Sequence, residues 1–343
     1  MPSMTFTAAI DAALGDAMGQ DGRVVVLGED VRMLRRDLFV RFGPDRVRDT
    51  PISEAALLGA GLGAAMAGLR PVVEITFVDF IGVAFDVLLN HVAKVTAFSG
   101  GRWQVPLVVR SACGGGYGDG GQHEQALWGL LSGIPGLAVV VPSTPADAAG
   151  LLLGALDHQG PVMFLEHKLL SEVWLDYLGG THRPSVDFAV PAAGARGEVP
   201  QPFEPTTLGR AAVRREGDDL AIVSIGVGVH LAVEAASQLA DEEVEAAVLD
   251  LRSVAPLDRD AVLGLARRTG RVLVVDEDYQ RGGLSGEVAA VLAESDVSAR
   301  FGRVTTESTI PYALALEEET LPNVPRILAA ARGLLSRSAG PGV

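Results

Sequence analysis

"DTPISEAALLGAGLGAAMAGLRPVVEITFVDFIGVAFD", residues 49–86, is the stretch that decides the fold of this 343-residue chain. Residues 55–68 have the spacing of a helix rich in glycine and alanine, and residues 70–77, "RPVVEITF", form an apolar β-branched run. A strand that is apolar on both faces and alternates with helices is typical of a parallel sheet covered on both sides. The stretch therefore predicts an α/β fold.

The same alternation extends through most of the chain. Further strands are expected at 23–28, 105–111, 137–143, 161–167, 220–226, 244–252 and 271–278. Helices are expected at 83–97, 145–157, 229–240, 258–268 and 285–294. The pattern breaks between 179 and 205, where glycine and proline are frequent. We predict two three-layer α/β domains with mostly parallel sheets, at 1–180 and 206–343, joined by a linker at 181–205.

Composition excludes several classes of function. A net charge of −15 argues against a surface for nucleic acid or for an anionic membrane. The single cysteine, Cys113, excludes an internal disulfide and fits a reducing compartment. The start of the chain lacks the basic segment of a secretory signal. The longest charge-free run, 125–146, contains three prolines, and we interpret it as a helix, a turn and a strand. We expect a cytoplasmic protein that is not inserted in a membrane.

Two glycine motifs imitate nucleotide sites. Gly59, Gly61 and Ala64 satisfy the dinucleotide pattern, but a true fingerprint follows a strand directly, whereas these residues lie inside the helical run. We favour close helix packing over NAD binding. The stretch "GGGYGDGGQHE", 114–124, lacks the lysine and the Ser/Thr of a P-loop. We interpret it as a flexible active-site loop, with a plain surface turn as the alternative.

Residues 49–86 resemble the β subunits of thiamine-diphosphate-dependent 2-oxo acid dehydrogenases, the pyruvate, branched-chain and acetoin decarboxylating components. The likeness continues, in order, through 94–125, 134–156 and 248–278, so it covers nearly the whole chain. The block around "PISEA" is its most specific part. The resemblance implies a transketolase-like pyrimidine-binding domain followed by a transketolase C-terminal domain.

The resemblance gives Glu54 a catalytic role. In the family, the glutamate of "PISE" hydrogen-bonds to N1′ of the aminopyrimidine and favours the imino form, whose 4′-nitrogen takes the C2 proton. A carboxyl group in an apolar pocket has a raised pKa and is suited to sharing that proton. From the residues alone, Ser53 can cap the helix and Glu54 suits the positive end of its dipole. That structural role is the alternative.

Three further positions follow from the resemblance. Phe80 matches the aromatic ring that stacks on the aminopyrimidine, and Ile52 matches an apolar cofactor contact; an ordinary core aromatic is the alternative for Phe80. His123 matches a histidine near the reacting carbon, where it handles protons or guides the acyl acceptor. The alternative for His123 is a plain loop residue. The family usually has Ser where this chain has Glu124, which places a second carboxylate near the site and suggests a different substrate or acceptor.

The resemblance also implies a partner. Gly118, Asp119 and Gly120 begin the thiamine-diphosphate metal motif, but neither Asn90 nor Asn323 stands where the motif needs its asparagine. In the family the full motif lies on an α subunit, which holds Mg²⁺ in an α2β2 heterotetramer. The helix at 55–68 is then expected to be a tight subunit contact, and the chain alone is expected to be inactive.

Two more family sites remain open. Some members bind K⁺ near the turn that corresponds to 156–161; here Gly160 replaces a common asparagine, which leaves a site built from backbone carbonyls. The C-terminal domain is expected to dock the dihydrolipoyl acyltransferase core.

The leading interpretation is a subunit that decarboxylates a 2-oxo acid and passes the acyl group to lipoyl-lysine. A relative that performs carboligation or acyl transfer without a lipoyl core is the alternative, suggested by Glu124 and the loop before it. A non-catalytic subunit is a third interpretation, against which Glu54 and Phe80 argue. The sequence does not determine which 2-oxo acid is used.

Overall fold

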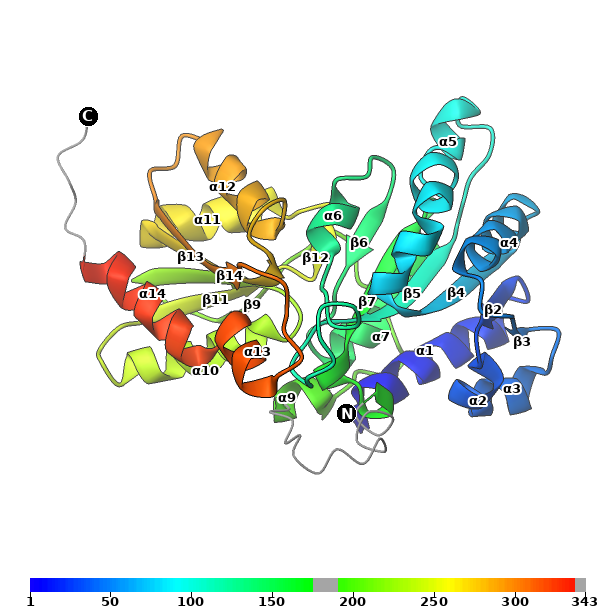
Figure 1. Cartoon of the computed structure of the whole chain (residues 1–343), viewed down its shortest axis with the longest axis horizontal. Helices are drawn as coiled ribbons and strands as arrows, with labels where there is room; N and C mark the ends of the chain where they lie inside the picture. Colours follow the sequence, from blue (N-terminus) through cyan, green and yellow to red (C-terminus); the bar gives the residue numbers. More distant parts are fainter. Residues whose placement is uncertain (175–190, 337–343) are drawn as a thin grey trace.

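The computed structural model describes residues 1–174 and 191–336. Two large sheets lie side by side, and helices cover the faces of each (Figure 1). A third sheet has only two strands. The predicted α/β class is confirmed.

The first sheet has seven strands in the order β12-β6-β7-β5-β4-β2-β3. Neighbouring strands are parallel, except that β12 is antiparallel to β6. The strands are β2 (Val24–Gly28), β3 (Val47–Asp49), β4 (Arg70–Phe77), β5 (Val108–Cys113), β6 (Ala138–Val140), β7 (Val162–His167) and β12 (Ser253–Ala255).

Helices of different length cover this sheet. They are α1 (Phe6–Gln20), α2 (Val31–Leu34), α3 (Arg36–Phe42), α4 (Glu54–Met66), α5 (Val95–Phe98), α6 (Trp128–Ser132) and α7 (Pro145–Asp157). Helix α7 begins where the sequence predicts, because Thr144 accepts a hydrogen bond from the Asp147 backbone and Pro145 suits the first turn.

The single helix predicted over 83–97 is wrong. A 3₁₀ helix, η1 (Val78–Ala84), is followed by a π-helical turn, η2 (Val87–Val92), and by α5. The segment bends by 75° at the break. A tight turn followed by a wide one changes the helix direction, which the 3.6-residue spacing cannot reveal. Within the described residues no single helix has the length and apolarity to cross a membrane, and only this bent pair matches on length and composition.

The second sheet has five strands in the order β14-β13-β10-β11-β9. They are β9 (Ala212–Arg215), β10 (Leu220–Ser224), β11 (Ala246–Asp250), β13 (Arg271–Tyr279) and β14 (Arg300–Thr306). Its helices are α10 (Gly228–Ala240), α11 (Arg259–Thr269), α12 (Leu284–Ala293), α13 (Leu314–Thr320) and α14 (Val324–Ser336). All pairs are parallel except β9 with β11.

The segment between the sheets is docked over its described part. After helix α9 (Ala192–Ala195), strand β8 (Arg196–Glu198) pairs with β1 (Ser3–Thr5). The Thr206 backbone N–H then donates to the Gly150 carbonyl on α7 at 2.8 Å. Residues 191–205 therefore pack against the first half of the chain, while residues 181–190 lie outside the described range. The boundaries 1–180, 181–205 and 206–343 stay predictions.

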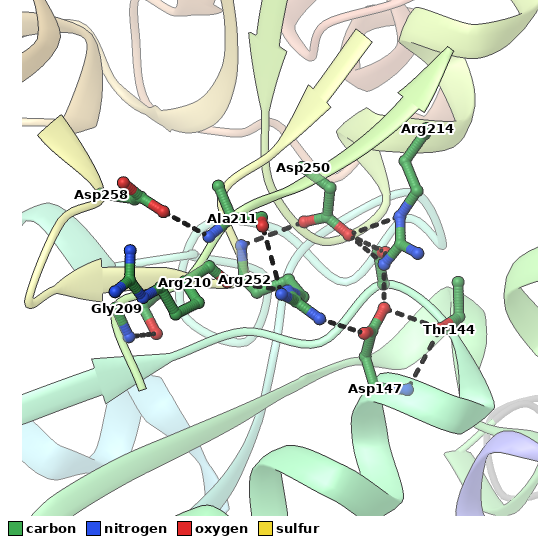
Figure 2. A network of polar contacts seen from close by, with 11 residues as sticks. Thr144, Asp147, Gly209, Arg210, Ala211, Arg214, Asp250, Arg252 and Asp258 are labelled. Atoms are coloured by element: carbon green, nitrogen blue, oxygen red, sulfur yellow. Dashed lines mark hydrogen bonds and ion pairs between the residues drawn. The ribbon is translucent and has the colours of Figure 1, made fainter. Parts of the chain in front are cut away.

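A buried polar network ties the two halves together. Figure 2 shows Asp147, on α7, between two guanidinium groups, those of Arg214 and Arg252. Arg214 also pairs with the fully buried carboxylate of Asp250, with 2.7 Å between Nη2 and Oδ2. Burial raises the pKa of Asp250, and Arg214 opposes that rise. Both acids need the arginine, so the network fixes strand β9 against helix α7.

The core is continuous across the junction. Val139 of β6 and Val141 just after it belong to the same buried cluster as Leu251 and Val254. Strand β12, which is part of the second half of the chain, completes the first sheet. Loops from the second half are thereby held rigidly beside the edge of the first sheet.

Candidate active site

All four predicted site residues follow the carboxyl ends of parallel strands in the first sheet. Ile52 and Glu54 come after β3, Phe80 comes after β4, and His123 comes after β5. Parallel strands end at the same edge of a sheet, and in open α/β sheets ligands bind there. The topology therefore gathers these residues at one edge.

Phe80 and His123 are brought together by the structure. Their ring centroids are 5.8 Å apart, with the planes nearly perpendicular. Phe77 lies 5.7 Å from Phe80 and 5.8 Å from His123, and Trp174 packs on Phe77 at 5.0 Å. Edge-to-face rings of this kind are attractive and fix one another's orientation. Phe80 is partly buried in this group, and we call Phe77, Phe80, His123 and Trp174 the aromatic group.

His123 is oriented through its backbone and has an uncommitted ring nitrogen. Its carbonyl accepts hydrogen bonds from the Tyr117 hydroxyl at 2.7 Å and from the Lys168 ammonium. Its Nδ1 is buried without a hydrogen-bond partner among the described residues, and lies 3.8 Å from a carboxylate oxygen of Asp119. An imidazole nitrogen without an internal partner can donate or accept one further hydrogen bond.

Lys168, which the sequence reasoning missed, packs its ammonium group on the aromatic group. Its ammonium is fully buried, 4.7 Å from the Phe77 ring centroid and 5.0 Å from that of Tyr117, and it donates to the Gly114 carbonyl at 3.0 Å. Burial lowers the pKa of Lys168, and surrounding carboxylates oppose that shift. A lysine directly after the apolar strand 161–167 was the available signal.

Glu54 is the first residue of α4 and is partly buried. The predicted cap by Ser53 is wrong, because its side chain makes no capping hydrogen bond. Among the described residues, nothing donates a hydrogen bond to the Glu54 carboxylate or pairs with it as a cation. Close contact between Gly61 and Val73 fixes α4 on strand β4. Ile52, two residues before Glu54, is 74% exposed, so its side chain is available to a partner.

Glu29 is a second acid beside Glu54 that the sequence reasoning missed. It directly follows strand β2, whose neighbours in the sheet are β3 and β4. The pKa of Glu29 is raised, first by partial burial and then by the nearby carboxylates of Asp30 and Glu54. An acid at the end of an apolar strand was the signal in the sequence.

The glycine-rich loop is filled by the chain's own carboxylates. Three glutamates accept hydrogen bonds of 2.6 to 3.2 Å from five backbone N–H groups, those of Gly115, Gly116, Tyr117, Gly118 and Gly120. The acceptors are Glu277 on β13, Glu317 on α13 and Glu124 in the loop itself. The loop predicted to be flexible is therefore fixed by hydrogen bonds along its backbone. Glu124 turns its carboxylate into the loop backbone rather than standing free at the site.

These contacts test the fit to the cofactor implied by the resemblance. The aminopyrimidine half fits, because Phe80 offers a ring and Glu54 an unpaired carboxylate at the same sheet edge. The diphosphate half does not fit this chain: the loop N–H groups are already occupied, and the described residues contain no group of three or more metal-ligating side chains. The residues of this chain therefore fit only the aminopyrimidine half of the cofactor.

Family models match both halves of the chain. Residues 2–172 match the transketolase pyrimidine-binding domain, and residues 209–327 match the transketolase C-terminal domain. A solved structure described as a split-gene transketolase, an inactive β4 tetramer, has a TM-score of 0.78 at 24% identity and is 99% covered by this chain, 97% of which aligns. That likeness supports the fold alone.

Curated relatives extend the likeness over the full length. The 2-oxoisovalerate dehydrogenase subunit beta of Bacillus subtilis is 37% identical, covering 97% of this chain and 99% of its own. The acetoin:2,6-dichlorophenolindophenol oxidoreductase subunit beta of the same organism is also 37% identical, with 96% and 97% covered. Its pyruvate dehydrogenase E1 component subunit beta is 36% identical, with 98% and 99% covered. The chain therefore belongs to the transketolase-like family of E1 β subunits of thiamine-diphosphate-dependent 2-oxo acid dehydrogenases.

Proposed function

We propose that this chain and an α subunit form the E1 component of a 2-oxo acid dehydrogenase, arranged as an α2β2 heterotetramer. It decarboxylates a 2-oxo acid and transfers the acyl group to lipoyl-lysine of a dihydrolipoyl acyltransferase core, which the C-terminal domain docks. The observation that carries the proposal is the half-site itself. Phe80 and His123 pack together at the sheet edge where Glu54 also lies, whereas the N–H groups of the glycine-rich loop are occupied by Glu124, Glu277 and Glu317.

Each residue at the sheet edge has a task in this proposal. Thiamine diphosphate, when bound, supplies the carbon nucleophile and the electron sink for decarboxylation. Glu54 shares a proton with N1′ of the aminopyrimidine, Phe80 offers its ring as a flat apolar surface, and Ile52 adds an apolar contact. His123 gives or takes a proton near the reacting carbon, through an imidazole that the aromatic group keeps oriented.

The missing half of the site is assigned to the α subunit, which holds Mg²⁺. Helix α4 offers it a surface of small residues, since Ala56, Ala60 and Gly63 are exposed. Exposed apolar side chains of Ile52 and Val83 flank this helix in the sequence. A K⁺ site built from backbone carbonyls at 156–161 and a cytoplasmic location complete the proposal.

The carboligation alternative loses its main motivation. It was suggested by Glu124 in place of the usual serine, but this carboxylate is fully buried and binds the backbone of Tyr117 and Gly120. Glu124 therefore has a structural partner within the loop and offers no contact to a different acceptor.

Reconstitution with an α subunit tests the proposal. The complex is expected to transfer the acyl group of a 2-oxo acid to the lipoyl-lysine of a lipoyl domain, whereas the chain alone is expected to show no turnover. Glu54→Gln should lower kcat by about 10²–10⁴, the range for loss of a general acid-base group, and should weaken thiamine-diphosphate binding measured by circular dichroism. Glu287→Gln, which changes an acid in the first turn of α12, is the control for the helix-dipole effect. Unchanged activity of Glu54→Gln would exclude the catalytic role.

A further inference from the structure

Two buried glutamates hold the loop that carries His123. Glu124 and Glu317 are both fully buried, with 0% of each residue exposed. Glu317, on helix α13, accepts hydrogen bonds from Gly116 at 2.6 Å and Gly118 at 2.7 Å. Glu124 accepts from the N–H groups of Tyr117 and Gly120, which alternate with those two along the loop. Two carboxyl groups from distant parts of the chain therefore fix the loop through hydrogen bonds to its backbone.

The two side chains also flank the same residue, Gly115. A Cβ added there would lie 3.1 Å from Oε1 of Glu317 and 3.5 Å from Cβ of Glu124. Burial, followed by the neighbouring Glu317, raises the pKa of Glu124 to about 8. Ionising two neighbouring buried carboxyl groups together costs free energy, because both charges lose hydration and repel each other. One proton between them instead gives a hydrogen bond. The titratable groups that face the pair are Tyr117, Asp119 and His123 of the loop, Lys168 after β7, Glu277 of β13, and Tyr312 before α13.

We propose that Glu124 and Glu317 share a single proton, and that this proton keeps the His123 loop closed. Both are positioning residues, because they contact the loop backbone and act on the reaction through His123; to that extent the inference rests on the proposed function. The arrangement also accounts for the glutamate where the family usually has serine. A serine would leave Glu317 without the partner that shares its proton.

The sharing predicts how loop opening depends on pH. In the closed loop Glu124 keeps its proton up to about pH 8, whereas an opened, hydrated Glu124 returns to its ordinary pKa of 4.5. Opening between these values releases one proton, so the fraction of open loop rises about tenfold for each unit of pH. Above about pH 8 the closed loop has already lost the proton, and the dependence levels off.

Amide hydrogen exchange of the full-length chain measures this directly. Protection of the loop 114–121, corrected for the intrinsic exchange rate and divided by that of strand β10, should fall about 100-fold between pH 5.5 and 7.5. The infrared band of a protonated carboxyl should disappear near pH 8. A loop whose protection does not change over this range in the wild-type chain would overturn the proposal.

Variants separate the shared proton from simple packing. Glu317→Gln keeps one acceptor and gives Glu124 a donor that does not titrate, so the pH slope should vanish while protection at pH 8 rises. Glu124→Ser should also remove the slope. Glu318→Gln, on the exposed side of α13, is the matched control and should keep it. The same slope in Glu317→Gln as in the wild type would refute the sharing.

Exchange requires neither cofactor nor partner, so this result is independent of turnover. A slope in a chain that fails to form an active complex supports the shared proton and refutes the proposed function. An active complex whose loop shows no slope supports the proposed function and refutes the shared proton.

Discussion

Replacing Gly61 by alanine will destabilise the chain, whereas the same change at Gly63, on the same helix, will stabilise it. A Cβ at Gly61 would lie 2.5 Å from Cγ2 of Val73 and 3.3 Å from Cδ1 of Leu107. Val73 is β-branched and fully buried in strand β4, so it cannot rotate away easily. At Gly63 no described atom lies within 4 Å of the added carbon.

The magnitudes follow from two opposing effects. Alanine in place of glycine in a helix interior gains about 1 kcal/mol at either position. Overpacking a well-filled core costs about 1–3 kcal/mol, and only Gly61 meets it. Gly63→Ala should therefore gain about 1 kcal/mol, while the central expectation for Gly61→Ala is a loss of about 1 kcal/mol.

Denaturant unfolding of the purified chain, followed by tryptophan fluorescence, measures both changes. Gly59→Ala is a second control, because its Cβ also meets no described atom within 4 Å. If Gly61→Ala and Gly63→Ala were equally stable, α4 would not be in close contact with β4, and the packing interpretation of these glycines would fail.

Three further outcomes are expected. Arg214→Met removes the partner of two buried acids and should cost about 3–5 kcal/mol of unfolding free energy, whereas Arg215→Met, which breaks a more exposed pair with Glu245, should cost under about 1 kcal/mol. Burial, followed by the Asp278 charge, raises the pKa of Asp276 to about 7. The free energy of unfolding should therefore fall by on the order of 4 kcal/mol as pH rises from about 4 to 7. Denaturant titrations at several pH values should show that Asp276→Asn removes this part of the pH dependence. Gly63→Leu should leave the chain folded but prevent assembly with the α subunit, as size-exclusion chromatography would show; an intact heterotetramer would remove α4 from the interface.

Much of the fold was predictable because its signals are local. Apolar β-branched runs mark the strands, and helix α7 matches its predicted range at both ends because Thr144 and Pro145 define its start. The helical spacing of residues 55–68 also places Gly59 and Gly61 inside a helix rather than in a nucleotide loop, and α4 confirms this. Patterns within a few residues are sufficient for such features.

What the sequence concealed depends on distant contacts. The residues around Glu317 give no sign that it binds the glycine-rich loop, because its contact with Gly116 spans 201 positions of the sequence. The bend between η1 and η2 accompanies a change from 3₁₀ to π hydrogen bonding, which the spacing of apolar residues does not reveal. Phe80 and His123 could be named only through the family resemblance; that they meet is a consequence of strand order, which periodicity does not contain.

Strand β12 also ties the order of folding to the order of synthesis. Its residues leave the ribosome long after strand β6, with which they pair. Until then β6 is an uncovered edge, and uncovered edges invite pairing between chains. A first half expressed alone, or a gene divided at the predicted linker, would keep that edge open permanently. The two halves should therefore reach their native state in one concerted step, and separate expression should give aggregates rather than two soluble domains.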